Sequence, residues 1–191
     1  MTPQNIFIDC GTNLGQGLQK ISDLENIDDL WTVYSFEPNP HTFLLIKRNR
    51  NVRYFNVAVS DSYGFSQFNC EKWDNNGFIG GASTLIPLEN WHTERVYGFR
   101  PSNIQTLVPI IDLTDFILSL EPEEKSIVLK LDIEGSEYKI LKKFQELNLF
   151  KYIKKLYIEF HDHLLQSPGQ FPASYWVDFF SSINLKFTIW D

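Results

Sequence analysis

The chain has 191 residues, of which 43% are hydrophobic and 15% aromatic, enough to build the core of one domain. Its formal net charge of −7 argues against a nucleic acid as the main partner, because binding to a phosphate backbone relies on clustered Lys and Arg side chains. Its two cysteines are too few for a disulfide framework, and no apolar run approaches the roughly 20 residues that cross a bilayer. We therefore expect residues 1–191 to form a single soluble, cytoplasmic domain with no membrane span and no nucleic acid partner.

Short apolar runs alternate along the chain with helical patterns. Runs that are bounded by turn residues predict buried strands at residues 6–8, 32–36, 54–59, 127–131, 156–160 and 185–190. Apolar residues at helical spacing predict four helices, which carry Leu18, Phe43, Leu141 and Trp176. This order is typical of an α/β fold, in which helices cover both faces of a mostly parallel central sheet.

The stretch from about residue 65 to residue 109 interrupts this rhythm and contains the aromatic residues Trp73, Trp91 and Tyr97. One interpretation is a substrate-side lid or binding loop, in which these rings would stack on a carbohydrate. The other is an antiparallel hairpin that covers an edge of the sheet and uses the same rings for its core. Both interpretations make the stretch an insertion beside the central sheet.

Acidic side chains stand where three of the predicted strands end. Asp9 ends the first strand and leads into a turn with Gly11 and Gly15, Glu37 ends the second strand, and Asp132 ends the fourth. Glycine lacks a Cβ and so allows a ligand to approach the backbone closely. Because ligands of open α/β sheets bind outside the carboxyl ends of the strands, we expect these residues to meet at one cleft.

The spacing of the acidic residues indicates a cofactor that contains a nucleoside. Glu37 follows Gly17 by 20 residues, where an acidic side chain would accept hydrogen bonds from ribose hydroxyls. A dinucleotide site would carry a third glycine after Gly15 and Gly17, and Lys20 stands there instead. S-adenosylmethionine carries an ammonium and a sulfonium group, so an acidic site suits it better. An NAD-type oxidoreductase and a non-catalytic module that binds a nucleoside remain the alternatives.

Five segments in chain order resemble the FkbM-type family of S-adenosylmethionine-dependent methyltransferases. They are residues 7–15 (FIDCGTNLG), 36–40 (FEPNP), 56–61 (NVAVSD), 129–137 (LKLDIEGSE) and 158–161 (IEFH). The resemblance implies a Rossmann-like class I methyltransferase fold, here without its last antiparallel strand. It also implies methyl transfer to a hydroxyl oxygen, with a sugar, a glycan or a related natural product as the acceptor.

The resemblance further implies a set of cofactor-binding residues. They are Asp9, Gly11, Asn13, Gly15, Glu37, Asn39, Ser60, Asp61 and Asp132. The residues of the first turn would hold the methionyl end and those after the second strand the ribose. Ser60 or Asp61 would bind the adenine amino group, and Asp132 would face the amino group or the methyl donor. An equally good interpretation of Asp61 makes it the cap of the turn at residues 60–64.

Methyl transfer to an alcohol requires a group that removes the hydroxyl proton. We predict His161 as this base, with Glu159 orienting it and Glu134 at the mouth of the acceptor pocket. In an extended strand His163 would lie on the same face as Glu159 and His161, although a solvated loop residue is the simpler interpretation of His163. Asp132, Glu159 and His161 could also hold Mg²⁺ or a similar divalent ion, which the residues leave optional.

The partner expected from these patterns is a small-molecule or glycan acceptor. The segment at residues 80–85 (GGASTL) resembles a family loop near the acceptor, with Ser83 as its contact. The first strand begins about five residues into the chain, and the usual final strand pair is incomplete. A second subunit of a homo-oligomer, or the rest of a longer polypeptide, would therefore cover the open sides.

Overall fold

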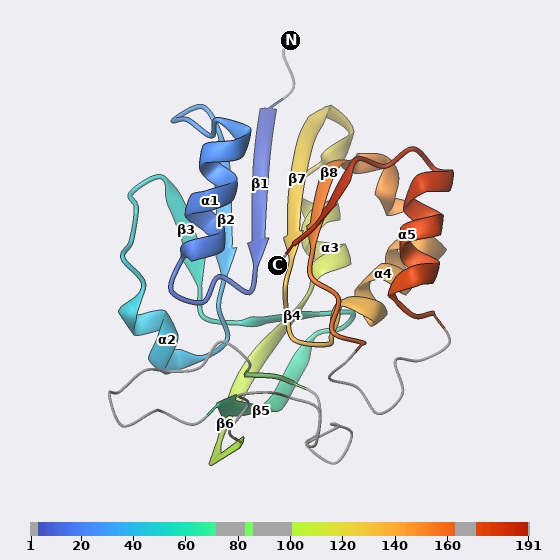
Figure 1. Cartoon of the computed structure of the whole chain (residues 1–191). Coiled ribbons are helices and arrows are strands. Elements are labelled where there is room, and N and C mark those ends of the chain that lie inside the picture. Colours follow the sequence, from blue (N-terminus) through green and yellow to red (C-terminus); the bar gives the residue numbers. More distant parts are fainter. Residues whose placement is uncertain (1–3, 72–82, 86–100, 163–170, 191) are drawn as a thin grey trace.

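The computed structural model describes residues 4–71, 83–85, 101–162 and 171–190. Its central feature is a sheet of six parallel strands, which confirms the predicted fold class (Figure 1). In spatial order the strands are β3 (Val52–Phe55), β2 (Thr32–Phe36), β1 (Gln4–Cys10), β7 (Lys125–Leu131), β8 (Ile153–Ile158) and β9 (Phe187–Ile189).

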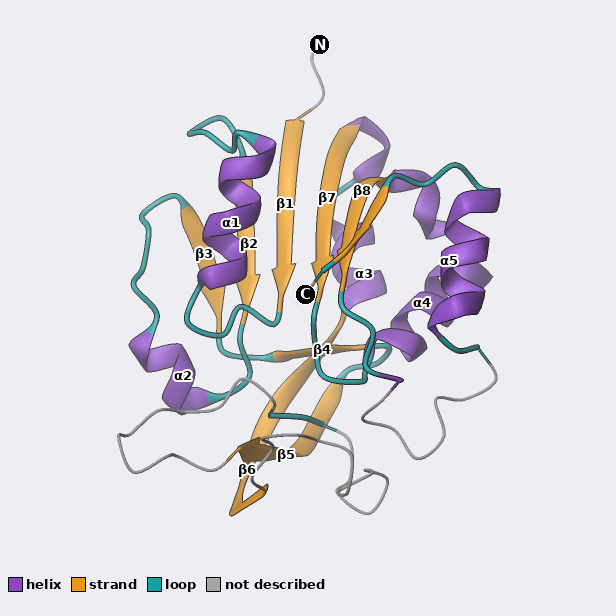
Figure 2. Ribbon diagram, in the orientation of Figure 1, coloured by secondary structure: helices purple, strands orange, loops and turns teal. Residues whose placement is uncertain are grey.

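Helices cover both faces of this sheet, as the alternation of strands and helices predicted (Figure 2). On one face Phe7 packs against Leu18 and Ile21 of the first helix; on the other Ile8 belongs to the cluster that three later helices complete. None of the helices in these ranges is long and apolar enough to span a membrane. The helical segments are α1 (Gln16–Glu25), α2 (Pro40–Leu45), α3 (Leu113–Ser119), α4 (Glu137–Glu146) and α5 (Ala173–Ser182), with short 3-10 turns η2 (Pro122–Glu124) and η3 (Leu149–Tyr152).

A second, smaller sheet lies below the carboxyl ends of the parallel strands (Figure 1). It consists of β4 (Ala58–Ser60), β6 (Pro101–Asp112) and β5 (Gly64–Glu71), with β5 and β6 antiparallel. The described part of the predicted insertion is therefore a strand pair, to which Thr84 is joined by backbone hydrogen bonds of 2.8 and 3.0 Å with Asn69. The rings proposed to stack on a carbohydrate, Trp73, Trp91 and Tyr97, and also His163, lie outside the described residues.

The single strand predicted at residues 54–59 is wrong. The chain leaves the large sheet after Phe55 and enters the small sheet at Ala58. Between them the Asn56 side chain donates hydrogen bonds to the carbonyl oxygens of Glu37 and Pro38, at 2.8 and 3.1 Å. These bonds hold the chain where it turns across the carboxyl ends of the strands, and β4 continues into the small sheet below them (Figure 1).

Candidate active site

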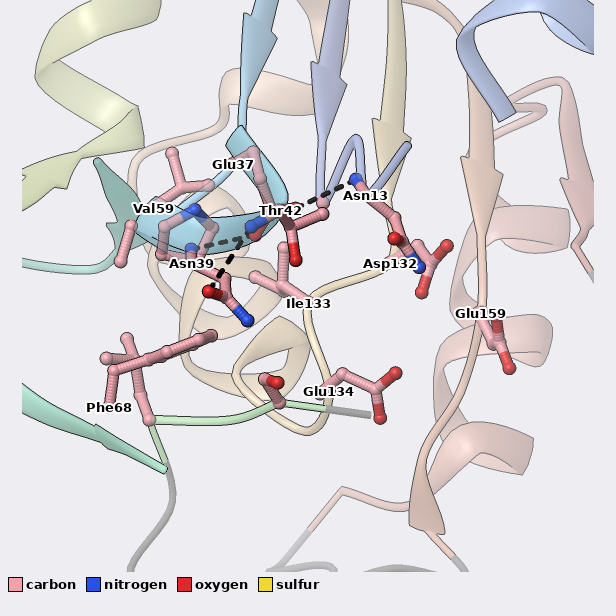
Figure 3. Close-up of a pocket in the computed structure, with 15 residues that line it drawn as sticks. Asn13, Glu37, Asn39, Thr42, Val59, Phe68, Asp132, Ile133, Glu134 and Glu159 are labelled. Atoms are coloured by element: carbon pink, nitrogen blue, oxygen red, sulfur yellow. Dashed lines mark hydrogen bonds between the residues drawn. The ribbon is translucent and has the colours of Figure 1, made fainter. Parts of the chain in front are cut away.

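A cavity of about 250 Å³ lies at the carboxyl ends of the parallel strands, between the two sheets (Figure 3). It brings together most of the predicted site. From the residues predicted by sequence, its lining includes Gly11, Asn13, Glu37, Asn39, Ser83, Asp132, Glu134 and Glu159. The small sheet and its neighbouring segment add apolar side chains, namely those of Ala58, Val59, Phe68 and Leu85.

Glu37 lies at the centre of the cavity wall and is only 7% exposed. Its carboxylate accepts the backbone N–H of Asn13 at Oε2 and that of Asn39 at Oε1, both at 2.8 Å. Burial raises the pKa of Glu37 to about 7, although these two hydrogen bonds act in the opposite direction. One carboxylate thus connects the turn after β1 with the turn after β2, beside the space for a ligand.

Gly11 allows the turn after β1 to lie directly against the end of β7. Its φ is +82°, and a Cβ built there would lie 1.7 Å from the carbonyl oxygen of Asp132. Its N–H donates to the carbonyl oxygen of Phe36 at 3.0 Å, so the turn is also held by β2. The sequence therefore needs glycine here for close packing of three strand ends, which in turn shapes the cavity floor.

Asp9 does not reach the cavity, although it was predicted to hold the methionyl end of the cofactor. Its side chain is fully buried behind the turn, where it accepts the Thr12 hydroxyl at 2.8 Å and pairs with Lys130 at 3.4 Å. Burial raises the pKa of the Asp9 carboxyl, and the Lys130 ammonium partly offsets this effect. The alternation of β1 explains the placement, since Asp9 shares the face of Phe7 that α1 covers.

Ser60 and Asp61, predicted to bind the adenine amino group, are also outside the cavity lining. The Ser60 hydroxyl donates to Asp61 Oδ1 at 3.1 Å, and the Asp61 carbonyl oxygen accepts Lys143 Nζ at 2.8 Å. The apolar side chains of Val59 and Phe68 form the wall on this side instead (Figure 3). A flat, apolar ligand group fits this wall better than a polar one.

Asp132, Glu134 and Glu159, the acidic cluster, line the opposite side of the cavity (Figure 3). His161 lies next to it, with Nε2 at 3.4 Å from Glu134 Oε2 and 3.6 Å from Glu159 Oε1. It is only 2% exposed and, among the described residues, is not part of the lining. The carboxylates of the cluster therefore line the cavity, whereas the imidazole that contacts them does not.

Burial dominates the electrostatics of this side of the cavity. It raises the pKa of Glu134 to about 8 and that of Glu159 to about 7, although the charge of His161 lowers both. For His161 burial acts against the charged form, but Glu137, Glu134 and Glu159 together raise its pKa to about 10. These carboxylates therefore favour the charged imidazolium form of His161, whereas a base or a metal ligand would need the neutral form.

Glu137, the last residue of the segment 129–137, supports the turn before α4 although it was not among the predicted site residues. Its fully buried carboxylate accepts the backbone N–H of Ile133 at 2.7 Å and that of Gly135 at 2.9 Å. Its Oε1 also lies 3.0 Å from Nδ1 of His161. Glu159 was predicted to orient His161, and Glu137 holds the ring from the other side. The signal was present, since Glu137 lies on the same helical face as Ile140 and Leu141, which is buried.

With this geometry in place, the chain can be compared with known proteins. The sequence model of the methyltransferase FkbM domain matches residues 9–179. The chain belongs to the FkbM methyltransferase family. No curated protein matches it. Among solved structures it is similar to the crystal structure of methyltransferase FkbM from Methylobacillus flagellatus KT, with 14% identity and a TM-score of 0.49. That match covers 94% of this chain but only 37% of the other, so this chain spans little more than a third of that protein's length.

We expect the replacement of Glu137 by glutamine to lower the free energy of unfolding of the protein by about 2–4 kcal/mol. An amide cannot accept at both positions, so one backbone N–H of the turn loses its acceptor and His161 loses a charged partner. Urea denaturation of the two proteins measures the difference. Glu146→Gln on the same helix is the matched control, because that side chain is 61% exposed and lies 3.9 Å from Lys142. Equal stability of the two variants would contradict the role given to Glu137.

The same side of the FkbM-family site offers a set of ligands for a divalent ion. Single ligand atoms of Asp132, Glu134 and His161 all lie within 4.8 Å of one another. Two carboxylates and, once His161 has lost its proton, one imidazole nitrogen form a donor set that suits several divalent ions. The metal ligands predicted from the sequence were Asp132, Glu159 and His161, so the structure groups Glu134 rather than Glu159 with the other two. The Nδ1 side of His161 is held by Glu137, so Nε2 is the nitrogen that faces the carboxylates.

Proposed function

We propose that this chain binds S-adenosylmethionine in the cavity and transfers its methyl group to a hydroxyl oxygen of a sugar, a glycan or a related natural product. The observation that carries the proposal is the order of chemistry along the cavity wall. Val59 and Phe68 offer an apolar surface for adenine, Glu37 follows at the level of the ribose, and the acidic cluster lies beyond it. This order matches a ligand that is flat at one end and cationic at the other.

The acidic cluster would serve both the cofactor and the acceptor. When bound, S-adenosylmethionine supplies an electrophilic methyl group on a sulfonium. Carboxylates at this end of the cavity favour the positive charge of that group and of the ammonium beside it. Glu134 and Glu159 also line the space that an acceptor hydroxyl must enter, and a pKa of about 7 to 8 suits proton acceptance near neutral pH.

We therefore assign the proton-accepting step to Glu134 and Glu159, and a supporting position to His161. A bond forms between the acceptor oxygen and the methyl carbon, the bond from sulfur to that carbon breaks, and the hydroxyl proton passes to a carboxylate. His161 keeps the carboxylates in place through its Nε2 contacts at 3.4 and 3.6 Å. Base catalysis by His161 itself is the competing assignment, and the pH dependence discussed below separates the two.

Isothermal titration with S-adenosylmethionine, its demethylated product S-adenosylhomocysteine and NAD tests the cofactor. We expect the first two ligands to bind and NAD to give no measurable heat. Binding of NAD alone would favour the oxidoreductase alternative. Binding of the adenosyl ligands without methyl transfer to any acceptor would favour the non-catalytic nucleoside-binding module.

A screen of glycans and nucleotide sugars with a labelled methyl donor tests the acceptor class. Incorporation of label into a sugar hydroxyl is the expected result, and transfer confined to nitrogen or carbon acceptors would contradict it. Running each reaction with and without a chelator addresses the divalent ion. Loss of transfer with the chelator, and recovery when Mg²⁺ is restored, is the result that would assign an ion to Asp132, Glu134 and His161.

A further inference from the structure

Lys130 is a buried cation beside the main cavity, and neither the strand pattern nor the resemblance assigns it a role. It is 1% exposed in β7, and its Nζ lies 2.8 Å from the Gly11 carbonyl oxygen and 2.9 Å from Asp132 Oδ2. Asp9 Oδ1 lies 3.4 Å from the same nitrogen. Burial opposes its charge, but the two carboxylates raise the pKa of Lys130, so the side chain is an ammonium at neutral pH.

The surrounding backbone is shaped to admit this side chain. Asp9 and Lys130 are register partners in the parallel strands β1 and β7, so their side chains leave the sheet on the same face. There α1 passes over them with Gly17, where a Cβ would lie 2.8 Å from Lys130 Cε. The turn after β1, the end of β7 and the start of α1 therefore all meet around one lysine.

Lys130 also lines a second cavity that adjoins the main one. This second cavity of about 280 Å³ is lined by Lys130 and Gly17, and it shares Gly11, Asn13 and Asp132 with the main cavity. Asp132 is the shared side chain that carries charge, and Lys130 holds it through Oδ2. The other carboxylates of the acidic cluster would repel Asp132, so a neighbouring cation stabilises it at this position.

We propose that Lys130 is a positioning residue, which holds the Asp132 carboxylate and the Gly11 carbonyl in the arrangement that receives the amino-acid end of the cofactor. The inference rests on the proposed binding of S-adenosylmethionine in the main cavity. It extends that proposal, because it divides cofactor affinity into two parts. Lys130 acts on the amino-acid end through Asp132, whereas Glu37 and the apolar wall contact the nucleoside.

Two ligands separate these parts. S-adenosylhomocysteine has both the nucleoside and the amino-acid end, whereas methylthioadenosine has the nucleoside and thioether alone. We expect Lys130→Met to weaken S-adenosylhomocysteine about tenfold or more, and to change the affinity for methylthioadenosine less than about twofold. Isothermal titration measures both. Lys125→Met is the matched control, because Lys125 lies at the far end of the same strand and donates to Gln4 at 3.1 Å.

Each outcome of this experiment decides the inference. Equal weakening of the two ligands would overturn it in favour of a purely structural role, and so would unchanged binding of S-adenosylhomocysteine. The double variant Asp9→Asn with Lys130→Met removes both members of the buried pair, and it carries the same test if the single variant does not fold. Failure of the wild-type protein to bind either ligand would overturn the proposed function, and this inference with it.

Discussion

Replacement of Glu37 by alanine is expected to weaken the binding of S-adenosylhomocysteine by about 100-fold or more. The buried carboxylate accepts the N–H groups of Asn13 and Asn39, so its loss releases both turns and removes the group proposed to bind the ribose. Isothermal titration measures the affinity, and circular dichroism reports whether the variant keeps its fold. Glu37→Gln should fall between wild type and alanine, because its amide oxygen can accept one of the two bonds.

The matched control for this prediction is Asp61→Ala. Asp61 was predicted from the sequence to contact adenine, whereas its side chain lies outside the cavity lining and accepts a hydrogen bond from Ser60. We therefore expect its replacement to change the affinity less than about twofold, the size of a surface substitution. A large loss in Asp61→Ala together with normal binding in Glu37→Ala would refute our description of the cofactor site.

The rate of methyl transfer at saturating substrate is expected to rise as the pH increases through about 7 to 8. A carboxylate accepts a proton only when it is ionised, and burial raises the pKa of Glu159 to about 7 and that of Glu134 to about 8. If His161 were the base, its neutral form would be needed, and the rate would rise only through about pH 10. A profile of kcat against pH shows in which of these two pH ranges the rate rises.

Two variants sharpen this pH measurement. Glu134→Gln is expected to lower kcat by about 10²- to 10⁴-fold, the usual range for a general base. His161→Asn removes the positive charge that lowers the pKa of Glu134 and Glu159, so the rising limb should move to higher pH. If kcat of the wild-type protein instead rises near pH 10, and this rise is absent from His161→Asn, His161 is the base.

The sequence predicted the half of the site that follows from topology. Asn13, Glu37, Asn39 and Asp132 come directly after strands, and in a parallel sheet the carboxyl ends of neighbouring strands lie at one edge. No tertiary contact had to be known for this prediction. The family of the chain was likewise recognisable, because the same strand ends carry the segments that resemble FkbM methyltransferases.

The parts that the sequence did not predict depend on the direction of single side chains. Ser60 belongs to the small sheet because the chain turns at Asn56. The side chain of Asn56 holds this turn by hydrogen bonds to Glu37 and Pro38, which lie 19 and 18 residues earlier and so outside any local sequence pattern. Lys130 and Glu137 are charged residues inside apolar patterns, and their partners Asp9 and His161 come from distant segments of the chain. Only the folded chain shows which charge each of them neutralises.

The hydroxyl of Thr84 donates to the carbonyl oxygen of Glu134 at 2.6 Å, and the backbone of Thr84 pairs with Asn69 of β5. The peptide that presents Glu134, the proposed proton acceptor, is thus joined to the part of the molecule beside which an acceptor would enter. An engineer who exchanges the small sheet to change acceptor choice would also displace Glu134. Selectivity and turnover should therefore change together in such chimaeras, unless Thr84 and its partner strand are transplanted as one piece.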